Sequence, residues 1–136
     1  MDKWGVPMGV PRQYLMAIAN RESSLHPWTI NVAGDNEYGQ SQEYTLRLIN
    51  QIVLMGYKSI DVGCMQMNLR WHGSKFRTLE EMLNPDHNVY QASKFLVGLY
   101  KEYGNWPQAI GAYHSRLPSL GQAYYKSLSM EIHSNE

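Results

Sequence analysis

Glu22 is the residue whose type and position most directly suggest catalysis. It lies seven positions after Leu15 and four after Ile18, so a helix through this run would place its carboxyl on the same face as these apolar side chains. Ionising a carboxyl on an apolar face is costly, so such a group either pairs with a cation or keeps its proton to a higher pH. A general acid needs a proton held near neutral pH, which makes Glu22 a candidate. The alternative is a glutamate at a helix end that pairs with Lys or Arg or extends into water.

A second group of polar residues lies between Asp61 and Asn68. Gly63 permits another group to approach the backbone closely, and Gln66 and Asn68 supply neutral amides that both donate and accept hydrogen bonds. Neutral amides suit the hydroxyl and acetamido groups of sugars, so this segment is a candidate carbohydrate contact. The alternative is a polar turn that leads into a helix.

Tyr113 and His114 form a third candidate group. Tyr113 lies three positions after Ile110, on the apolar side of the helix expected there. A buried tyrosine usually directs its hydroxyl to a partner, either a carboxylate or a backbone carbonyl. The alternative for Tyr113 is core packing.

Helices must position these three groups, because most local signals along the chain are helical. Proline and capping residues at helix starts, apolar residues at helical spacing and terminal glycines define the expected elements. They predict helices at 11–23, 41–56, 78–84, 87–103, 107–113 and 119–132, the last opened by a capping box of Ser119 with Gln122. We expect a loop at 24–41 and a single strand-like segment at 58–63, too short to define a sheet. The predicted fold is mainly α: one domain over residues 1–136 with five to six or more helices and little or no β-structure.

Composition narrows the possible partners. The 136 residues carry 12 Lys and Arg against 12 Asp and Glu, and this balance argues against nucleic acid as the main partner. No unbroken apolar run is longer than the six residues 14–19, so we expect no integral membrane segment. The five histidines show no paired ligand spacing, so we expect neither a metal nor another cofactor.

Taken together and in this order, the three groups resemble a family pattern. Glu22–Ser23, Gly63–Asn68 and Ala112–His114 resemble the glutamate-serine, glycine-leucine-methionine-glutamine and alanine-tyrosine motifs of the soluble lytic transglycosylases. The resemblance runs from about Val10 to about Leu128 and is greatest to the branch associated with secretion systems and conjugation, where motifs like Asn31–Gly34 and Ser59–Gly63 also occur. Two positions depart from the pattern: Cys64 replaces leucine or isoleucine, and His114 with Ser115 replaces an asparagine-alanine-glycine ending.

The resemblance implies a lysozyme-like fold with a groove for peptidoglycan glycan strands. The bond cleaved would be the β-1,4 bond between N-acetylmuramic acid and N-acetylglucosamine, and the product would carry a 1,6-anhydromuramic end. This chemistry needs one carboxylate, with Glu22 acting as acid and then as base while the substrate's own N-acetyl oxygen stabilises the anomeric carbon. The branch further implies that a secretion or conjugation apparatus is a partner.

The remaining motif residues receive roles by the same resemblance. Ser23 and Gln66 would place the acetamido group and the sugar, and Met65 would line the groove. Tyr113 would hydrogen-bond the Glu22 carboxyl or the reacting region. Three further residues are possible supports of the site: Asp61, Asn68 and His114. Trp71, His72 and Tyr124 are weaker candidates to border the groove, since aromatic rings also build cores.

Three other functions remain open. A hydrolytic muramidase of the same fold would use a second carboxylate, with Asp61 preferred over Asp35 and Glu37. A thiol peptidase or amidase would use Cys64 with His114 as nucleophile and base. A glycan-binding module would keep the groove without the chemistry.

A peptidoglycan-cleaving enzyme must reach the cell wall. The start, Met1–Asp2–Lys3, has none of the apolar character of a signal peptide. We therefore expect a periplasmic or exported bacterial protein whose signal peptide has been removed from this chain.

Overall fold

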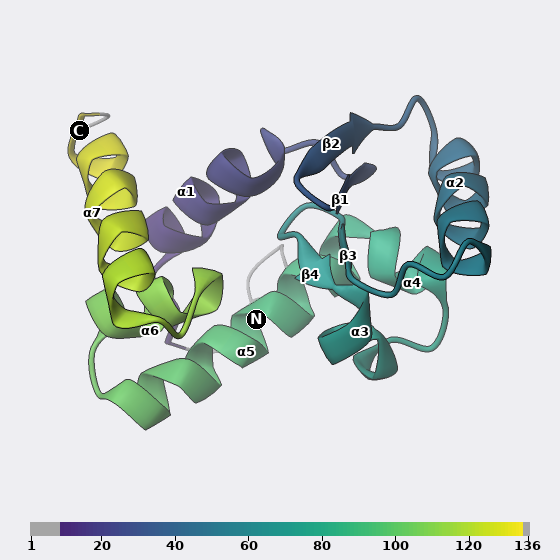
Figure 1. Ribbon diagram of the computed structural model, residues 1–136. Helices are drawn as coiled ribbons and strands as arrows, with labels where there is room; N and C mark the ends of the chain where they lie inside the picture. The colour runs from purple at the N-terminus through teal and green to yellow at the C-terminus, as the bar shows by residue number, and fades with distance from the viewer. Residues whose placement is uncertain (1–8, 135–136) are drawn as a thin grey trace.

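Seven α-helices and a small antiparallel sheet make up the computed structural model, which describes residues 9–134 (Figure 1). The elements in chain order are α1 (Arg12–Ser23), β1 (Thr29–Val32), β2 (Asp35–Tyr38), α2 (Gln42–Leu54), β3 (Ile60–Val62), β4 (Met67–Asn68), α3 (Leu69–His72), a 3₁₀ turn (Gly73–Lys75), α4 (Leu79–Leu83), α5 (Pro85–Tyr103), α6 (Trp106–His114) and α7 (Pro118–Ser134). The mainly helical class predicted from the sequence is confirmed. The predicted domain also includes 1–8 and 135–136, which lie outside the described residues.

The sheet has the strand order β2-β1-β3-β4, with each neighbouring pair antiparallel. The prediction of a loop over 24–41 is therefore wrong, because β1 and β2 form a hairpin within it. The hairpin turns at Ala33 and Gly34, whose φ angles of 53° and 90° suit a two-residue turn that matches the twist of the strands. Strand β2 is exposed along its whole length, so no alternating apolar pattern marked it in the sequence.

Side-chain caps explain most helix starts. The hydroxyls of Ser41 and Thr78 accept hydrogen bonds from the backbone N–H groups of Tyr44 and Glu81, each at 3.0 Å, so α2 and α4 begin as expected. The capping box predicted at Ser119 is wrong. Helix α7 begins one residue earlier, at Pro118, because a proline at the first helical position has no N–H that needs a partner.

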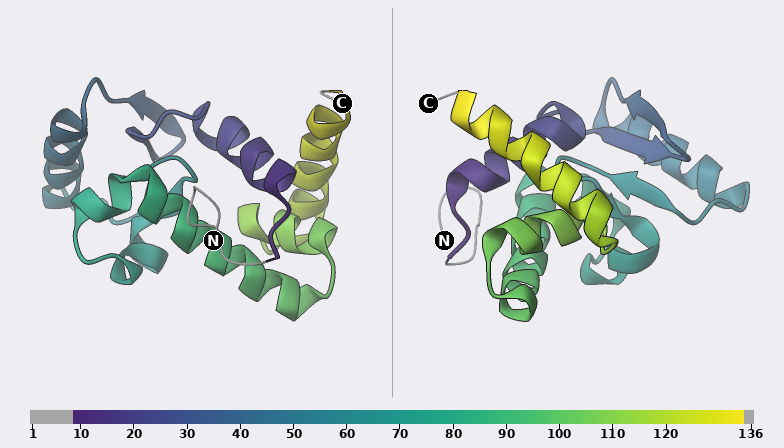
Figure 2. Two further views of the ribbon diagram at one scale, coloured as in Figure 1. Left: turned by 180° about the vertical axis from the view of Figure 1, so that it is seen from behind. Right: turned by 60° about the vertical axis from the view of Figure 1, so that its left-hand side comes forward.

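Helices α1 and α5 connect the parts of the fold. In Figures 1 and 2, α1 and α5 both extend between the α6–α7 pair on one side and the sheet with α2, α3 and α4 on the other. The hydrophobic core of the domain includes the fully buried side chains of Ile18, Ile30, Met65, Leu96 and Leu128. No helix in the described part of the chain is long and apolar enough to cross a membrane.

Helices α6 and α7 contact each other through backbone. A Cβ added to Gly111 would lie 2.7 Å from the carbonyl oxygen of Gly121, and one added to Gly121 would lie 3.0 Å from the carbonyl oxygen of Ser115. Only glycine permits this approach, which brings the two helices together as closely as backbones allow.

Candidate active site

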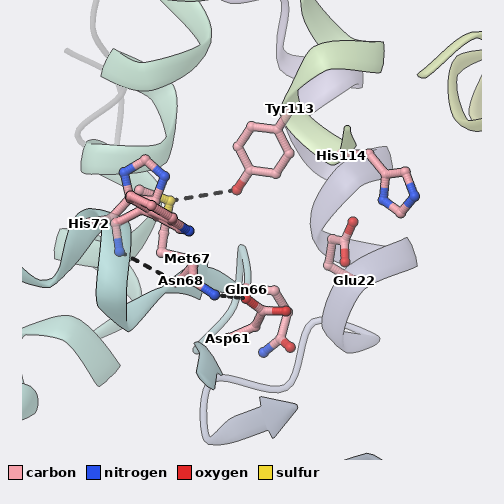
Figure 3. A pocket seen from close by; sticks show the side chains of 9 residues that line it. Glu22, Asp61, Gln66, Met67, Asn68, His72, Tyr113 and His114 are labelled. Carbon is pink, nitrogen blue, oxygen red and sulfur yellow. Dashed lines mark hydrogen bonds between the residues drawn. The ribbon is translucent and has the colours of Figure 1, made fainter. Parts of the chain in front are cut away.

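The three motifs predicted from the sequence meet around one cavity of about 270 Å³ (Figure 3). Its lining comes from α1, the β3–β4 region, α3 and α6. The lining residues are Glu22, Asp61, Gln66, Met67, Asn68, Trp71, His72, Tyr113 and His114. In Figure 3, Glu22 and His114 lie on one side and Met67, Asn68 and His72 on the other. A cavity lined by two carboxyls, amides and aromatic rings is suited to a polar ligand.

The Glu22 carboxyl lies half-buried near the end of α1 and accepts a hydrogen bond of 2.9 Å from the Tyr124 hydroxyl. Burial raises the pKa of Glu22, while Tyr124 and the nearby His114 counteract the rise. The charge of Asp61 adds to the rise. The net effect favours the protonated form, as a general acid requires.

Neighbouring groups fix the partners of Glu22 in place. The Tyr124 ring stacks on the His114 ring at 4.5 Å between centroids, with 4° between their planes. Arg21, the cation next in sequence, forms an ion pair with Glu131 at 3.0 Å and a hydrogen bond with Ser127. The alternative in which Glu22 forms an ion pair with a Lys or Arg side chain is therefore not the arrangement observed.

A buried side chain holds the loop that carries the second motif. This loop comprises residues 63–66, between β3 and β4, and is called the motif loop. Asn88 of α5 is fully buried and donates to the carbonyls of Val62 at 3.0 Å and Met82 at 2.9 Å, while its Oδ1 accepts from the Met65 N–H at 2.8 Å. Gly63 lies directly against it: with φ at +83°, an added Cβ would be 2.6 Å from Asn88 Nδ2. Asn88 was missed by the sequence analysis, although it lies four positions before Ala92 on the apolar stripe of its helix.

Ser23 and Met65 are buried and do not line the cavity. The Ser23 hydroxyl donates to the carbonyls of Ala19 at 2.9 Å and Cys64 at 2.7 Å. The bond to the Cys64 carbonyl joins the end of α1 to the motif loop. In this geometry both residues support the site without reaching the surface of the cavity. Their direct contact with a sugar stays a prediction.

Gln66 lines the cavity, and part of its amide is already engaged in hydrogen bonds. Its backbone is left-handed, with φ at 52°, and its Nε2 donates to the carbonyls of Thr29 and Gly63, each at 3.0 Å. These two bonds use both hydrogens of the amide. The group that Gln66 offers to a ligand is therefore its Oε1 acceptor.

Tyr113 points toward the motif loop. Its hydroxyl donates to the Met65 carbonyl at 2.6 Å and lies 3.7 Å from the Met67 sulfur. The expected hydrogen bond to the Glu22 carboxyl comes instead from Tyr124, which lies on a different helix. Tyr113 thus contacts the loop of the second motif and lines the cavity at the same time.

Asp61 is a second carboxyl in the cavity. Burial raises its pKa, although Asn68 Nδ2, which donates to it at 3.0 Å, and His114 both counteract the rise. The Oδ1 of Asn68 caps α3 by accepting from the N–H groups of Arg70 and Trp71. Asp61 and Asn68 also pair across β3 and β4, so the sheet register fixes where this carboxyl lies.

Cys64 does not have the environment of a nucleophile. It is buried and does not line the cavity. Burial raises the pKa of its thiol, whereas a nucleophilic cysteine needs a lowered one. The thiol peptidase alternative therefore has no support in this geometry.

Two aromatic residues border the opening. Trp71 lines the cavity and is 70% exposed, and His72 beside it has its pKa lowered to about 4 by burial and by Lys75. The described residues contain no group of three or more His, Cys, Asp or Glu side chains that could hold a metal ion.

A mainly helical domain whose cavity combines a half-buried carboxyl with amides and aromatic rings has the features of a carbohydrate-cleaving site. The family model of the transglycosylase SLT domain matches residues 1–127. The chain therefore belongs to the transglycosylase SLT domain family, and the resemblance seen in the three motifs is confirmed.

Two curated proteins are similar to the chain in sequence. Protein IpgF of Shigella sonnei and Protein IpgF of Shigella flexneri are each 31% identical to the chain over 119 residues. The matches cover 84% of this chain and 63% of each relative, so the chain spans less than two thirds of their length. The comparison with solved structures gave no significant match.

Proposed function

We propose that this protein is a peptidoglycan lytic transglycosylase that cleaves the β-1,4 bond between N-acetylmuramic acid and N-acetylglucosamine without water. The observation that carries the proposal is the Glu22 carboxyl, half-buried in the cavity and inclined toward its protonated form, in a chain of the SLT family. The cavity's amides and aromatic rings support an uncharged sugar as ligand.

In the proposed reaction, protonated Glu22 donates its proton to the leaving glycosidic oxygen. The N-acetyl oxygen of the muramic residue stabilises the anomeric carbon as the bond breaks. The Glu22 carboxylate then takes the proton of the C6 hydroxyl, and that oxygen bonds to C1. The products are an N-acetylglucosamine end and a 1,6-anhydromuramic end, and Glu22 regains its starting proton.

The other motif residues take positioning roles in this proposal. Gln66 Oε1 accepts from a sugar hydroxyl or from the acetamido N–H, and Trp71 stacks on a pyranose ring. Tyr113 and Ser23 hold the motif loop against α1 and α6. Tyr124 and His114 orient the Glu22 carboxyl.

Digestion of purified sacculi followed by mass spectrometry tests the proposal. We expect anhydro-muropeptides from the wild type and none from Glu22→Gln, which keeps the size of the side chain but cannot donate the proton. A matched control is Glu80→Gln, an exposed glutamate on α4 away from the cavity, which should digest normally. Normal digestion by Glu22→Gln would overturn the assignment of the acid.

A second candidate function is a hydrolytic muramidase, which is favoured by one observation: Asp61 is a second carboxyl in the same cavity. Ionised, it would act as nucleophile or as base for water. Digestion in ¹⁸O-labelled water separates the two reactions, because hydrolysis gives labelled reducing ends and transglycosylation gives unlabelled anhydro ends. Asp61→Asn should abolish hydrolysis while leaving transglycosylation measurable.

We further propose that the protein works in the periplasm or after export and opens the wall locally for a secretion or conjugation apparatus. The branch-like motifs at 31–34 and 59–63 support this role. Fractionation of cells that express the full gene tests the location. Recovery only from the cytoplasm would overturn it.

A further inference from the structure

A second cavity, of about 480 Å³, lies along α5 beside the one that contains Glu22. Lys75, Lys94, Phe95, Glu102 and Arg116 are among its lining residues. We call it the cationic cavity because three of its four charged side chains are positive.

Two of these positive charges have no counter-ion among residues 9–134. Glu102 is engaged by Arg116, whose Nη1 lies 3.0 and 3.1 Å from its two carboxylate oxygens. Within the described part of the chain, neither Lys75 nor Lys94 forms an ion pair. Burial lowers the pKa of Lys75, and the nearby positive charge of Lys94 lowers it further.

The cationic cavity and the Glu22 cavity share a wall. Lys75 Nζ lies 2.8 Å from Nδ1 of His72, and His72 lines the Glu22 cavity. Phe95 packs against His72 at 4.6 Å and against Tyr113 at 5.7 Å between ring centroids, and Lys75 Nζ lies 5.0 Å from its ring centre. A ligand that fills the first cavity can therefore extend over this wall to the two lysines.

The position and the sign of these charges restrict which part of a substrate can lie beside the two lysines. The sugar backbone of the proposed substrate offers hydroxyl and acetamido groups and nothing that needs two ammonium groups. Its fixed negative charges are carboxylates of the peptide that muramic acid bears on its lactyl group. Ammonium groups bind carboxylates by charge-assisted hydrogen bonds. The chain has no net charge, so the attraction is local to this surface.

We propose that Lys75 and Lys94 bind a carboxylate of the peptide stem, which makes peptide-bearing glycan strands the preferred substrate; this rests on the function proposed above. The lysines then act on recognition and leave the bond-breaking step to Glu22. The preference weakens as ionic strength rises, because the site is open to solvent.

Kinetics on two matched substrates test the proposal: soluble glycan strands with their peptides, and the same strands stripped of peptides by an amidase. We expect the wild type to show a KM about tenfold lower on the peptide-bearing strands, with similar kcat. The double variant Lys75→Gln/Lys94→Gln should raise that KM to the value for stripped strands. Lys94→Gln alone, which leaves the contact between Lys75 and His72 intact, should give a smaller rise in the same direction.

Lys126→Gln is the matched control, since it removes the same charge from an exposed position on α7 that lines neither cavity. It should keep the wild-type preference. Equal wild-type KM values on the two substrates would overturn the proposal. So would a Lys75→Gln/Lys94→Gln double variant whose KM rises equally on both substrates.

Binding measurements separate this proposal from the proposed function. The affinity of Glu22→Gln for both substrates is measured by calorimetry, with and without the lysine substitutions. A preference for peptide-bearing strands that the lysines account for supports the cationic site even if the wild type cuts neither substrate. Cleavage without any such preference overturns the cationic site and leaves the transglycosylase assignment standing.

Discussion

Tyr124 donates a hydrogen bond of 2.9 Å to Glu22, a residue 102 positions earlier in the chain. The bond connects the C-terminal helix α7 to the end of α1 at the edge of the cavity. A donor on the carboxyl favours its ionised form and so limits the rise in pKa that burial causes. Tyr124 thereby influences both the orientation and the protonation of the proposed catalytic acid.

Tyr124→Phe should shift the pH dependence of cleavage upward. Without the hydroxyl, the ionised form of Glu22 loses a stabilising bond, so its pKa rises further and the protonated acid persists to higher pH. The descending limb of the kcat profile should move to higher pH, and kcat at its optimum should fall about tenfold because the carboxyl is less well oriented. A pH series on sacculi measures both.

Tyr57→Phe is the control for this substitution, since Tyr57 is half exposed and lies outside the cavity. It should leave the profile unchanged. A Tyr124→Phe profile that moves to lower pH would contradict the role assigned to the hydroxyl.

Cys64→Ala should leave the rate of glycan cleavage unchanged. Ser23 bonds to the backbone carbonyl of residue 64, which alanine keeps. Removing the buried sulfur should lower the free energy of unfolding by about 1 kcal/mol. Parallel assays of kcat and of denaturant unfolding check this, and loss of activity in a folded variant would revive the thiol mechanism.

Asn88→Ala should destabilise the fold by about 3 kcal/mol, because it leaves the carbonyls of Val62 and Met82 and the N–H of Met65 without their partner. The motif loop should loosen, so kcat should fall even where the variant is fully folded. Thermal unfolding and assays well below the melting temperature separate the two effects. Asn50→Ala, at an exposed position on α2, should change neither the melting temperature nor kcat.

Trp71→Ala should raise KM about fivefold with little change in kcat, since one stacking surface for a sugar is lost. Stability should hardly change, because the side chain is 70% exposed. Leu54→Ala, an 87% exposed apolar residue, provides the control for trimming a surface side chain. An unchanged KM for Trp71→Ala would remove this ring from the proposed sugar contact.

The parts that the sequence predicts well are those in which the decisive signal is local. Glu22 follows Leu15 and Ile18 at helical spacing, and Thr78 caps α4 through the backbone N–H of Glu81, within one turn. The hairpin of β1 and β2 was missed because its stabilisation comes from pairing with β3, which no short window contains. Exposed β2 offered no apolar pattern either.

In the candidate site, too, the sequence predicts what depends on local signals and misses what depends on tertiary contacts. The motif residues Glu22, Gln66 and Tyr113 do meet at one cavity. Their hydrogen-bond partners, however, depend on tertiary contacts: Tyr113 bonds to the motif loop and Tyr124 takes the place expected for it. Asn88 is a similar case, because a polar residue on an apolar stripe identifies a buried partner only when the facing loop is known.

The glycine contact between α6 and α7 limits which mutations the protein can tolerate. His114 and Tyr124, whose rings stack beside Glu22, each lie three residues after one of the two glycines, Gly111 and Gly121. A single methyl group at either glycine would push the helices apart and separate these rings without touching the cavity. Natural variation that preserves every motif residue can therefore still abolish the proposed activity at this crossing, so a motif match alone does not show that a related protein is active.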